Sequence, residues 1–185
     1  MSRLPAVLQH SDLSETELHA AKLDGEVYRV DHCFSPLDEI DGPRNRARSL
    51  ALMVPSRLIA ERLTAAWIHG AISRAPSRHQ FCTDITARIR PSALVAITVR
   101  EVVIEKEDLF ELAGLPVTTP IRTAVDLARC GSRFGGDELQ AVAHLVRIGE
   151  FGIEEVRRML DRRRNLPHKG LAIGRIEAAL RLSRR

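Results

Sequence analysis

The residues around Pro120 constrain the fold most, because an extended stretch leads directly into a helix whose start is marked twice. Pro116 has no amide hydrogen for a sheet ladder, so residues 115–119 are expected to be an extended piece in which Pro116 avoids a central ladder position. Thr119 can cap the free amides of a helix, and Pro120 suits its first position. Apolar residues then recur on one helical face, namely Ile121, Val125 and Ala128. We therefore expect a helix over 120–129 that packs against the core.

Three further helices are expected after this one, near residues 136–149, 153–164 and 171–183. Aromatic residues make up only 4% of the chain, so the core must be filled mainly by Leu, Ile, Val and Ala, as in packed helices. A chain of 185 residues can bury one good core, or one core and a small module. We expect a helix-rich α+β fold with a small sheet and a C-terminal helical bundle.

The N-terminal residues predict a truncated winged-helix-like unit. Ser14 and Glu17 have the spacing of a capping box, which indicates a helix running toward Leu23. Residues 26–30 then alternate polar and apolar like a half-buried strand. Only about 13 residues precede Ser14, too few for the three helices of a full winged helix.

A polar connector at residues 37–42 suggests a soft boundary between two units, which we expect at 1–36 and 37–185. Within the second unit the pattern predicts helices at 43–54 and 57–70. Two β-branched or alternating runs should pair in the small sheet, and a helical turn should follow them; these lie at 79–83, 100–104 and 109–112.

The net charge of +4 is concentrated in the C-terminal third, where residues 133–185 carry 12 Lys and Arg against 7 Asp and Glu. Such a segment suits the phosphates of a nucleic acid or an acidic protein surface, or it is simply a solvated helix face. The candidate basic partner surface consists of Arg157, Arg158, Arg162, Arg163, Arg164, Arg181, Arg184 and Arg185.

Patterns that carry catalysis or bind cofactors are not found in the sequence. The three cysteines, Cys33, Cys82 and Cys130, are widely spaced, and the seven histidines show no HxxxH or HExxH spacing. The acids of 105–108 with Asp84 match a magnesium nuclease site poorly. We therefore predict no catalytic residues, no metal and no cofactor.

The sequence also predicts no membrane segment, because no window approaches the run of roughly 18 apolar residues that a span requires. The first ten residues lack the layout of a secretory signal. We expect a cytoplasmic protein.

Two polar features lie on the expected helices. Arg122 and Asp126 are one turn apart and can pair on the helix; they either tie the helix to the preceding strands, which we favour, or form part of a partner surface. His69 lies beside Gly70 at a helix end, where we expect it to interact with the last carbonyls of that helix rather than act as a base.

Two stretches carry a family resemblance: Thr64–Gly70 reads TAAWIHG, and Gly114–Ala128 reads GLPVTTPIRTAVDLA. With the order of elements over residues 14–150, they make the chain similar to the AbiEi antitoxins. The resemblance implies an antitoxin encoded beside a nucleotidyltransferase-like toxin, often with an N-terminal winged helix that represses the pair's promoter. The family-motif residues, structural or partner-binding, are Thr119, Pro120, Arg122, Thr123 and Asp126.

The leading hypothesis is therefore a non-enzymatic antitoxin that neutralises a cognate nucleotidyltransferase toxin acting on tRNA or nucleotides. The alternative is a DNA-binding repressor of its own operon. Glu15 and Glu17 argue against it, since they lie at the start of the would-be recognition helix, where only Lys22 is basic. A nuclease is a third and weaker hypothesis, and the sequence leaves homo-oligomerisation open. We also expect that removing residues 1–36 spares neutralisation of the toxin.

Overall fold

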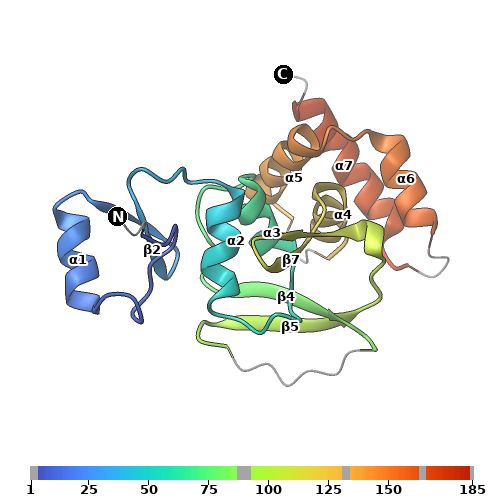
Figure 1. Cartoon of the computed structure of the whole chain (residues 1–185). Helices are drawn as coiled ribbons and strands as arrows, with labels where there is room; N and C mark the ends of the chain where they lie inside the picture. Colours follow the sequence, from blue (N-terminus) through green and yellow to red (C-terminus); the bar gives the residue numbers. More distant parts are fainter. Residues whose placement is uncertain (1–3, 87–92, 131–133, 163–165, 184–185) are drawn as a thin grey trace.

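The computed structural model describes residues 4–86, 93–130, 134–162 and 166–183 (Figure 1). An N-terminal unit lies at one side of a small sheet, and helices gather on the other side. The helices are α1 (Glu15–Leu23), α2 (Pro43–Ala51), α3 (Arg62–His69), α4 (Pro120–Cys130), α5 (Gly136–Gly149), α6 (Ile153–Asp161) and α7 (Lys169–Ser183), with a 3₁₀ turn η1 (Lys106–Asp108). The strands are β1 (Val27–Val30), β2 (Cys33–Pro36), β3 (Ile59–Ala60), β4 (His79–Asp84), β5 (Ile97–Val102), β6 (Leu109–Leu112) and β7 (Leu115–Thr118). The expected α+β class is confirmed.

The N-terminal unit consists of α1 and the antiparallel hairpin β1–β2. The predicted capping box at the start of α1 is present: the Glu17 amide donates to Ser14 Oγ at 3.3 Å, and the Ser14 amide donates to the Glu17 carboxylate at 2.9 Å. Apolar side chains from α1, the hairpin and the preceding segment form a small core, made of Leu8, Leu18, Val27 and Phe34. A helix followed by a two-stranded wing is consistent with the expected winged-helix-like unit.

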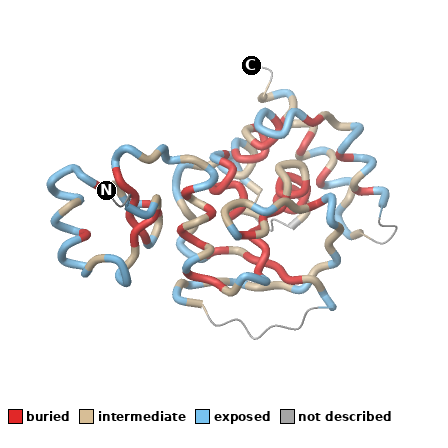
Figure 2. The backbone as a smooth tube through the Cα atoms, viewed as in Figure 1, coloured by how far each residue is buried: buried red, intermediate tan, exposed pale blue. Residues whose placement is uncertain are grey.

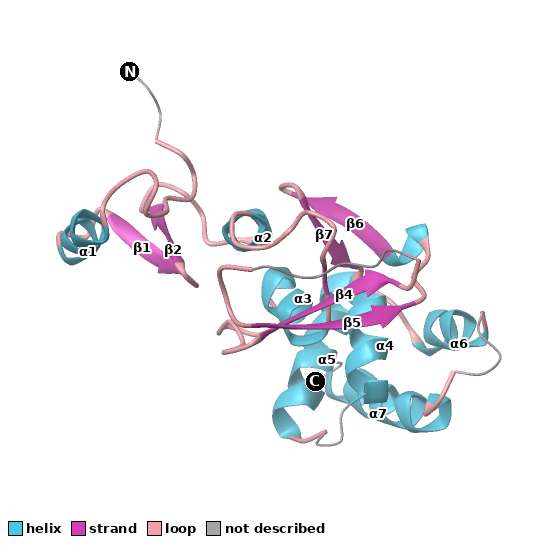
Figure 3. Cartoon of the chain, turned by 90° about the horizontal axis from the view of Figure 1, so that it is seen from below, coloured by secondary structure: helices cyan, strands magenta, loops and turns pink. Residues whose placement is uncertain are grey.

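The larger sheet has the strand order β5-β4-β3-β7-β6. Its middle strand β3 has two residues, of which Ala60 pairs with Phe81 of β4 and, in parallel, with Val117 of β7. Pro116 lies within β7 opposite Glu111, beside the single residue pair that joins β7 to β3. Figure 3 shows α3 and α4 against one face of this sheet, and α2 between the hairpin β1–β2 and the strands β6 and β7.

Two predicted elements were wrong. The helix expected from Arg57 begins only at Arg62, because residues 59–60 form the middle strand. Apolar residues at helical spacing misled the prediction, since a short apolar run also fits a strand buried on both faces. The helical turn expected at 109–112 is β6, which pairs with β7 along its whole length.

The other predicted elements form with shifted ends. The strand expected at 100–104 runs over Ile97–Val102, and the last helix begins at Lys169 rather than at 171. Helix α6 ends at Asp161, and residues 163–164 of the helix predicted there lie outside the described residues. The predicted helices 120–129 and 136–149 are confirmed as α4 and α5.

Two larger cores fill the rest of the molecule (Figure 2). One lies among α3, α4, α5, α6 and α7, and it includes Val125 and Ala128 from the predicted apolar face of α4. The other lies between the sheet and the helices α2 and α3, and Val30 and Cys33 of the hairpin contribute to it. The N-terminal unit therefore shares a core with the sheet.

Two further observations concern the packing of α4 against α5 and the length of the apolar helices. The α5 and α4 helices approach closely where Gly149 faces Pro120: a Cβ atom on Gly149 would lie 2.8 Å from Pro120 Cβ. In the described part of the chain, no helix combines the length and the apolar character needed to cross a membrane.

Candidate functional site

The two motif stretches meet where α3, β7 and α4 come together. His69 at the end of α3 lies 2.8 Å from the carbonyl oxygen of Thr118 in β7 through its Nε2 atom. A carbonyl only accepts, so Nε2 carries the hydrogen. The expected contact with the last carbonyls of α3 is therefore wrong: the partner of His69 is a strand carbonyl, 49 residues away in the chain. Burial lowers the pKa of His69, against a smaller opposite effect of this hydrogen bond.

The threonines of the motif hold the start of α4. The Thr118 and Thr123 hydroxyl oxygens are 2.7 Å apart, and both residues are fully buried. The Thr119 hydroxyl accepts from the Arg122 amide at 3.4 Å, which confirms its predicted role as the cap, and Pro120 occupies the first helical position. These residues fix the β7–α4 connection and leave little of themselves at the surface.

The predicted pair of Arg122 and Asp126 forms, and it is buried. Arg122 Nε donates to Asp126 Oδ2 at 2.8 Å, while Arg122 Nη1 donates to the Asp108 carboxylate on η1. Arg122 is 5% exposed and Asp126 is 1% exposed. Burial alone lowers the pKa of Arg122, but the carboxylates of Asp126 and Asp108 outweigh it and hold that pKa above its usual value. One guanidinium thus joins α4 to η1.

Asp126 is the centre of a larger network. Besides Arg122 it contacts Arg100 on β5 and Arg129 on α4, each at 3.3 Å. Arg100 in turn donates two hydrogen bonds of 2.6 Å to Glu61, the N-cap residue of α3. The network therefore ties α3, β5, α4 and η1 together in the interior. The partners Glu61, Arg100 and Asp108 were missed from sequence as a group, because nothing in their spacing links them.

Helix α6 covers the open side of this network. Arg162, just after α6, places Nη1 3.5 Å from Asp108 and 3.4 Å from Glu105. A cleft of about 20 Å³, large enough for no more than a single water, separates α4 from α6. Asp108 and Glu105 thus face arginines, and Asp84 accepts hydrogen bonds from Thr86 at the end of β4. These acids do not gather as a magnesium nuclease requires.

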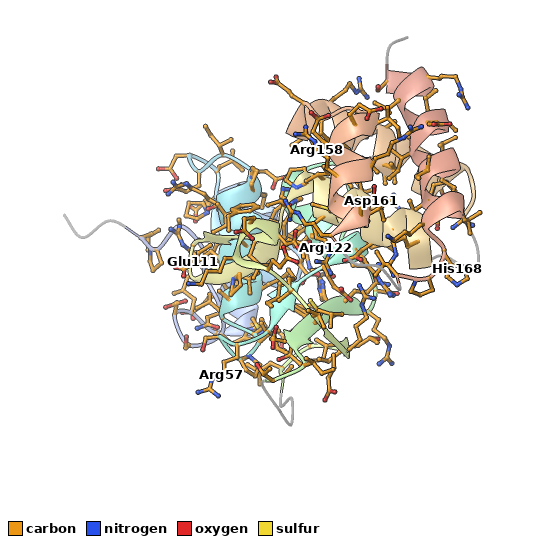
Figure 4. All side chains as sticks on the ribbon, turned by 90° about the vertical axis from the view of Figure 1, so that its right-hand side faces the viewer. Arg57, Glu111, Arg122, Arg158, Asp161 and His168 are labelled. Carbon is orange, nitrogen blue, oxygen red and sulfur yellow. The ribbon has the colours of Figure 1, made fainter. Side chains whose placement is uncertain are left out.

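The structure describes four of the eight arginines of the predicted basic surface, and one of these is Arg162, which lies beside Asp108 and Glu105. Arg157 and Arg158 are exposed on α6 and take part in ion pairs, Arg157 with Glu177 of α7 at 3.4 Å and Arg158 with Glu155 at 2.7 Å. Arg181 is exposed on α7. The remaining four lie outside the described residues, namely Arg163, Arg164, Arg184 and Arg185. Figure 4 shows Arg122 near the middle of the molecule, whereas Arg57 projects from its lower edge.

The structure describes two of the three cysteine side chains and one group of potential metal ligands. Cys33 and Cys82 are buried free thiols, whereas the side chain of Cys130 lies outside the described residues. Although the sequence predicted no metal, the fold gathers one set of three metal-type side chains within the described ranges: Asp31, His32 and His79. Spacing could not reveal this set, because its members meet only when the hairpin packs on the sheet.

Residues 59–166, more than half of the chain, match the model of a family described as the AbiEi antitoxin C-terminal domain. The chain belongs to the AbiEi antitoxin family. The match spans both motif stretches, the whole buried network and α6. The N-terminal unit precedes the part assigned to the AbiEi domain.

A solved structure has a similar fold. The crystal structure of the RV2827C protein from Mycobacterium tuberculosis has a TM-score of 0.51, with 19% identity, over 95% of the AbiEi chain and 72% of the other. At this identity the likeness concerns the fold alone. A comparison with curated proteins gave no match.

Proposed function

We propose that this AbiEi-family chain neutralises a nucleotidyltransferase toxin in the cytoplasm by binding it, without catalysis, through the arginines exposed on α6 and α7. The observation that carries the proposal is the separation of the arginines into two sets. Arg122 of the family motif is buried in the network around Asp126, whereas Arg157, Arg158 and Arg181 are exposed on the last two helices. Only the exposed set is available to a partner.

The chemistry of such a toxin fits these arginines. An enzyme that transfers nucleotides holds its magnesium ions with carboxylates, and the ions hold the phosphates, so its groove carries acidic side chains. The planar guanidinium of arginine pairs with a carboxylate through two parallel hydrogen bonds. A helix that places such arginines in the groove would therefore occupy the position of the nucleotide substrate.

The ion pairs that α6 already makes do not prevent this. Arg157 and Arg158 pair with exposed acids on α6 and α7, in high dielectric, where an ion pair contributes little and exchanges readily. A toxin carboxylate in a groove shielded from water offers a stronger partner than these surface acids.

The experiment is co-expression with the product of the adjacent gene, reading growth rescue and co-purification. Arg158→Glu, and the double change of Arg157 and Arg158 to Glu, should weaken both readouts. Arg57→Glu is the matched control, since Arg57 is exposed but lies before β3, away from α6. Rescue and co-purification unchanged by both α6 variants would contradict the proposed role of the α6 arginines, and the absence of any neighbouring toxin would contradict the proposed function.

We further propose that residues 37–185 contain the toxin-binding part, with residues 1–36 as a separate unit. Because Val30 and Cys33 belong to the core beneath the sheet, deletion of 1–36 would uncover that core. Point substitutions on the exposed side of α1 test whether residues 1–36 take part in toxin binding, and they leave that core covered. The DNA-binding alternative gains no support from α1, whose first turn carries Glu15 and Glu17.

A further inference from the structure

The tip of the hairpin β1–β2 meets the start of β4. Its two-residue turn is Asp31-His32, and Asp31 Oδ2 accepts a hydrogen bond from His79 Nε2 at 2.9 Å. His32 Nε2 lies 3.9 Å from the other carboxylate oxygen, Asp31 Oδ1. The three potential ligand atoms lie within 4.8 Å of one another, although His79 is 48 residues from Asp31 in the chain.

We propose that Asp31, His32 and His79 bind a divalent transition-metal ion of the zinc type, with solvent as the fourth ligand. Two imidazole nitrogens and one carboxylate are the donors that Zn²⁺ accepts in sites with an open position. Calcium and magnesium prefer sites made of oxygen atoms alone, so the donor set selects against them.

The three side chains need only a small movement to bind the metal, and most of it is made by His32. Ligands at the usual bond length of about 2.0–2.1 Å lie roughly 3.3–3.4 Å apart around a tetrahedral zinc ion. His79 and Asp31 are already closer than that, and they separate slightly as the metal replaces the shared hydrogen. His32 moves inward, and its side chain is 51% exposed and therefore has room to turn.

The surroundings of His79 match those of a metal-bound imidazole. The His79 side chain is 1% exposed, and its second nitrogen, Nδ1, lies 3.4 Å from the Thr64 hydroxyl on α3. That hydroxyl is held by the Gln80 amide, which donates to it at 2.7 Å. When metal binds, the His79 hydrogen moves from Nε2 to Nδ1 and is donated to Thr64, so the imidazole stays neutral. A hydrogen-bonded second nitrogen is the usual way in which a metal-binding histidine is oriented.

The turn itself is built to present the carboxylate. Asp31 has a φ of 54°, in the left-handed region that few residues other than glycine adopt. Arg29 Nε donates to the Asp31 carbonyl at 2.7 Å and so holds this conformation through the backbone. Both carboxylate oxygens consequently remain directed at the two histidines.

Neighbouring groups neither compete for the metal nor repel it strongly. Cys33 follows His32 in the chain, but its thiol is buried. Its Sγ is 3.8 Å from the Ser49 carbonyl oxygen. Arg46, which lines the adjoining cleft, is neutralised by a two-point pair with Asp41 at 2.8–2.9 Å.

The test uses the full chain after treatment with a chelator. Zinc is titrated by calorimetry into the wild type, His32→Ala and His19→Ala. His19 is the matched control, because it is also 51% exposed and also lies 3.9 Å from a carboxylate, that of Glu15, but belongs to no three-residue set. We expect one zinc per chain in the wild type and in H19A, and an affinity lower by at least about tenfold in H32A. The thermal midpoint should rise with zinc in the wild type and in H19A but not in H32A.

Three results would overturn the proposal. One is equal zinc affinity in H32A and the wild type. Another is an intense sulfur-to-metal absorption band on titration with Co²⁺, because it would place a cysteine in the site. Asp31→Asn serves as a second variant, with circular dichroism to verify its fold: a folded D31N that binds zinc as tightly as the wild type also contradicts the proposal.

Discussion

The arginines at the centre of the molecule and those on its last helices differ in burial and in their ion-pair partners. Arg100, Arg122 and Arg129 surround Asp126, which is almost fully buried. Arg157 and Arg158 pair with exposed acids one turn away or on the next helix. A buried charge is costly without its partner, whereas an exposed one is solvated either way. The first set should therefore determine stability, and the second should be free to serve binding.

The strongest test of this contrast is Asp126→Ala. It leaves three arginines around an empty position in the interior, and removal of one partner of a buried pair costs about 3–5 kcal/mol. Urea denaturation should show that loss in the free energy of unfolding. An Asp126→Ala protein as stable as the wild type would mean that water reaches the network, and the contrast with α6 would fail.

Gly149 tests how much close packing contributes to stability at a position where no ion pair is involved. A Cβ atom there would lie 2.8 Å from Pro120 Cβ and 2.9 Å from Phe151 Cδ1, so Gly149→Ala should destabilise the protein by about 1–3 kcal/mol. Gly174→Ala is the control, because Gly174 lies within α7 with open space around it. Alanine at that position should raise the free energy of unfolding by up to about 1 kcal/mol. Thermal unfolding of both variants gives the comparison, and equal shifts would contradict the close approach.

A smaller effect is expected from pH at His69. Burial depresses the pKa of His69 in the folded protein, so the unfolded chain binds a proton first as the pH falls. Stability from this group is complete above the ordinary histidine pKa of about 6.5 and is lost progressively below it. His69→Gln can keep a donor toward the Thr118 carbonyl but cannot titrate. Denaturation at about pH 7 and pH 5 should therefore show a flatter pH dependence for the variant, and identical slopes would refute this assignment.

The smallest effect on stability is expected on the exposed side of the contrast. Arg158→Ala removes one surface pair with Glu155, and the unfolding midpoint should not change measurably. Toxin binding, measured by calorimetry with the purified partner, should nevertheless weaken. A clear loss of stability in this variant would place Arg158 with the structural arginines.

The sequence was sufficient where local signals agree. The cap at Thr119, the first-turn Pro120 and the apolar face of α4 predicted that helix correctly, and Ser14 with Glu17 predicted α1. These signals depend on neighbours within one turn, so the chain itself contains the information.

The sequence was not sufficient where distant residues meet. The strand at residues 59–60 is defined by partners on both sides, 21 and 57 positions further along the chain, and its own residues read as part of a helix. The partners of Arg122 beyond Asp126 and the set formed by Asp31 and His79 also arise only from tertiary packing. A single sequence holds no direct record of such contacts.

The short middle strand has a consequence for the order in which the protein can assemble. While the ribosome is still making the C-terminal half, β3 can already pair with β4, but its other edge has no partner until Val117 has emerged. A nascent chain at that stage carries a bare strand edge, which invites pairing with other chains. In the finished protein one residue pair closes that edge, so completion of the sheet depends on β7 reaching its place beside β3.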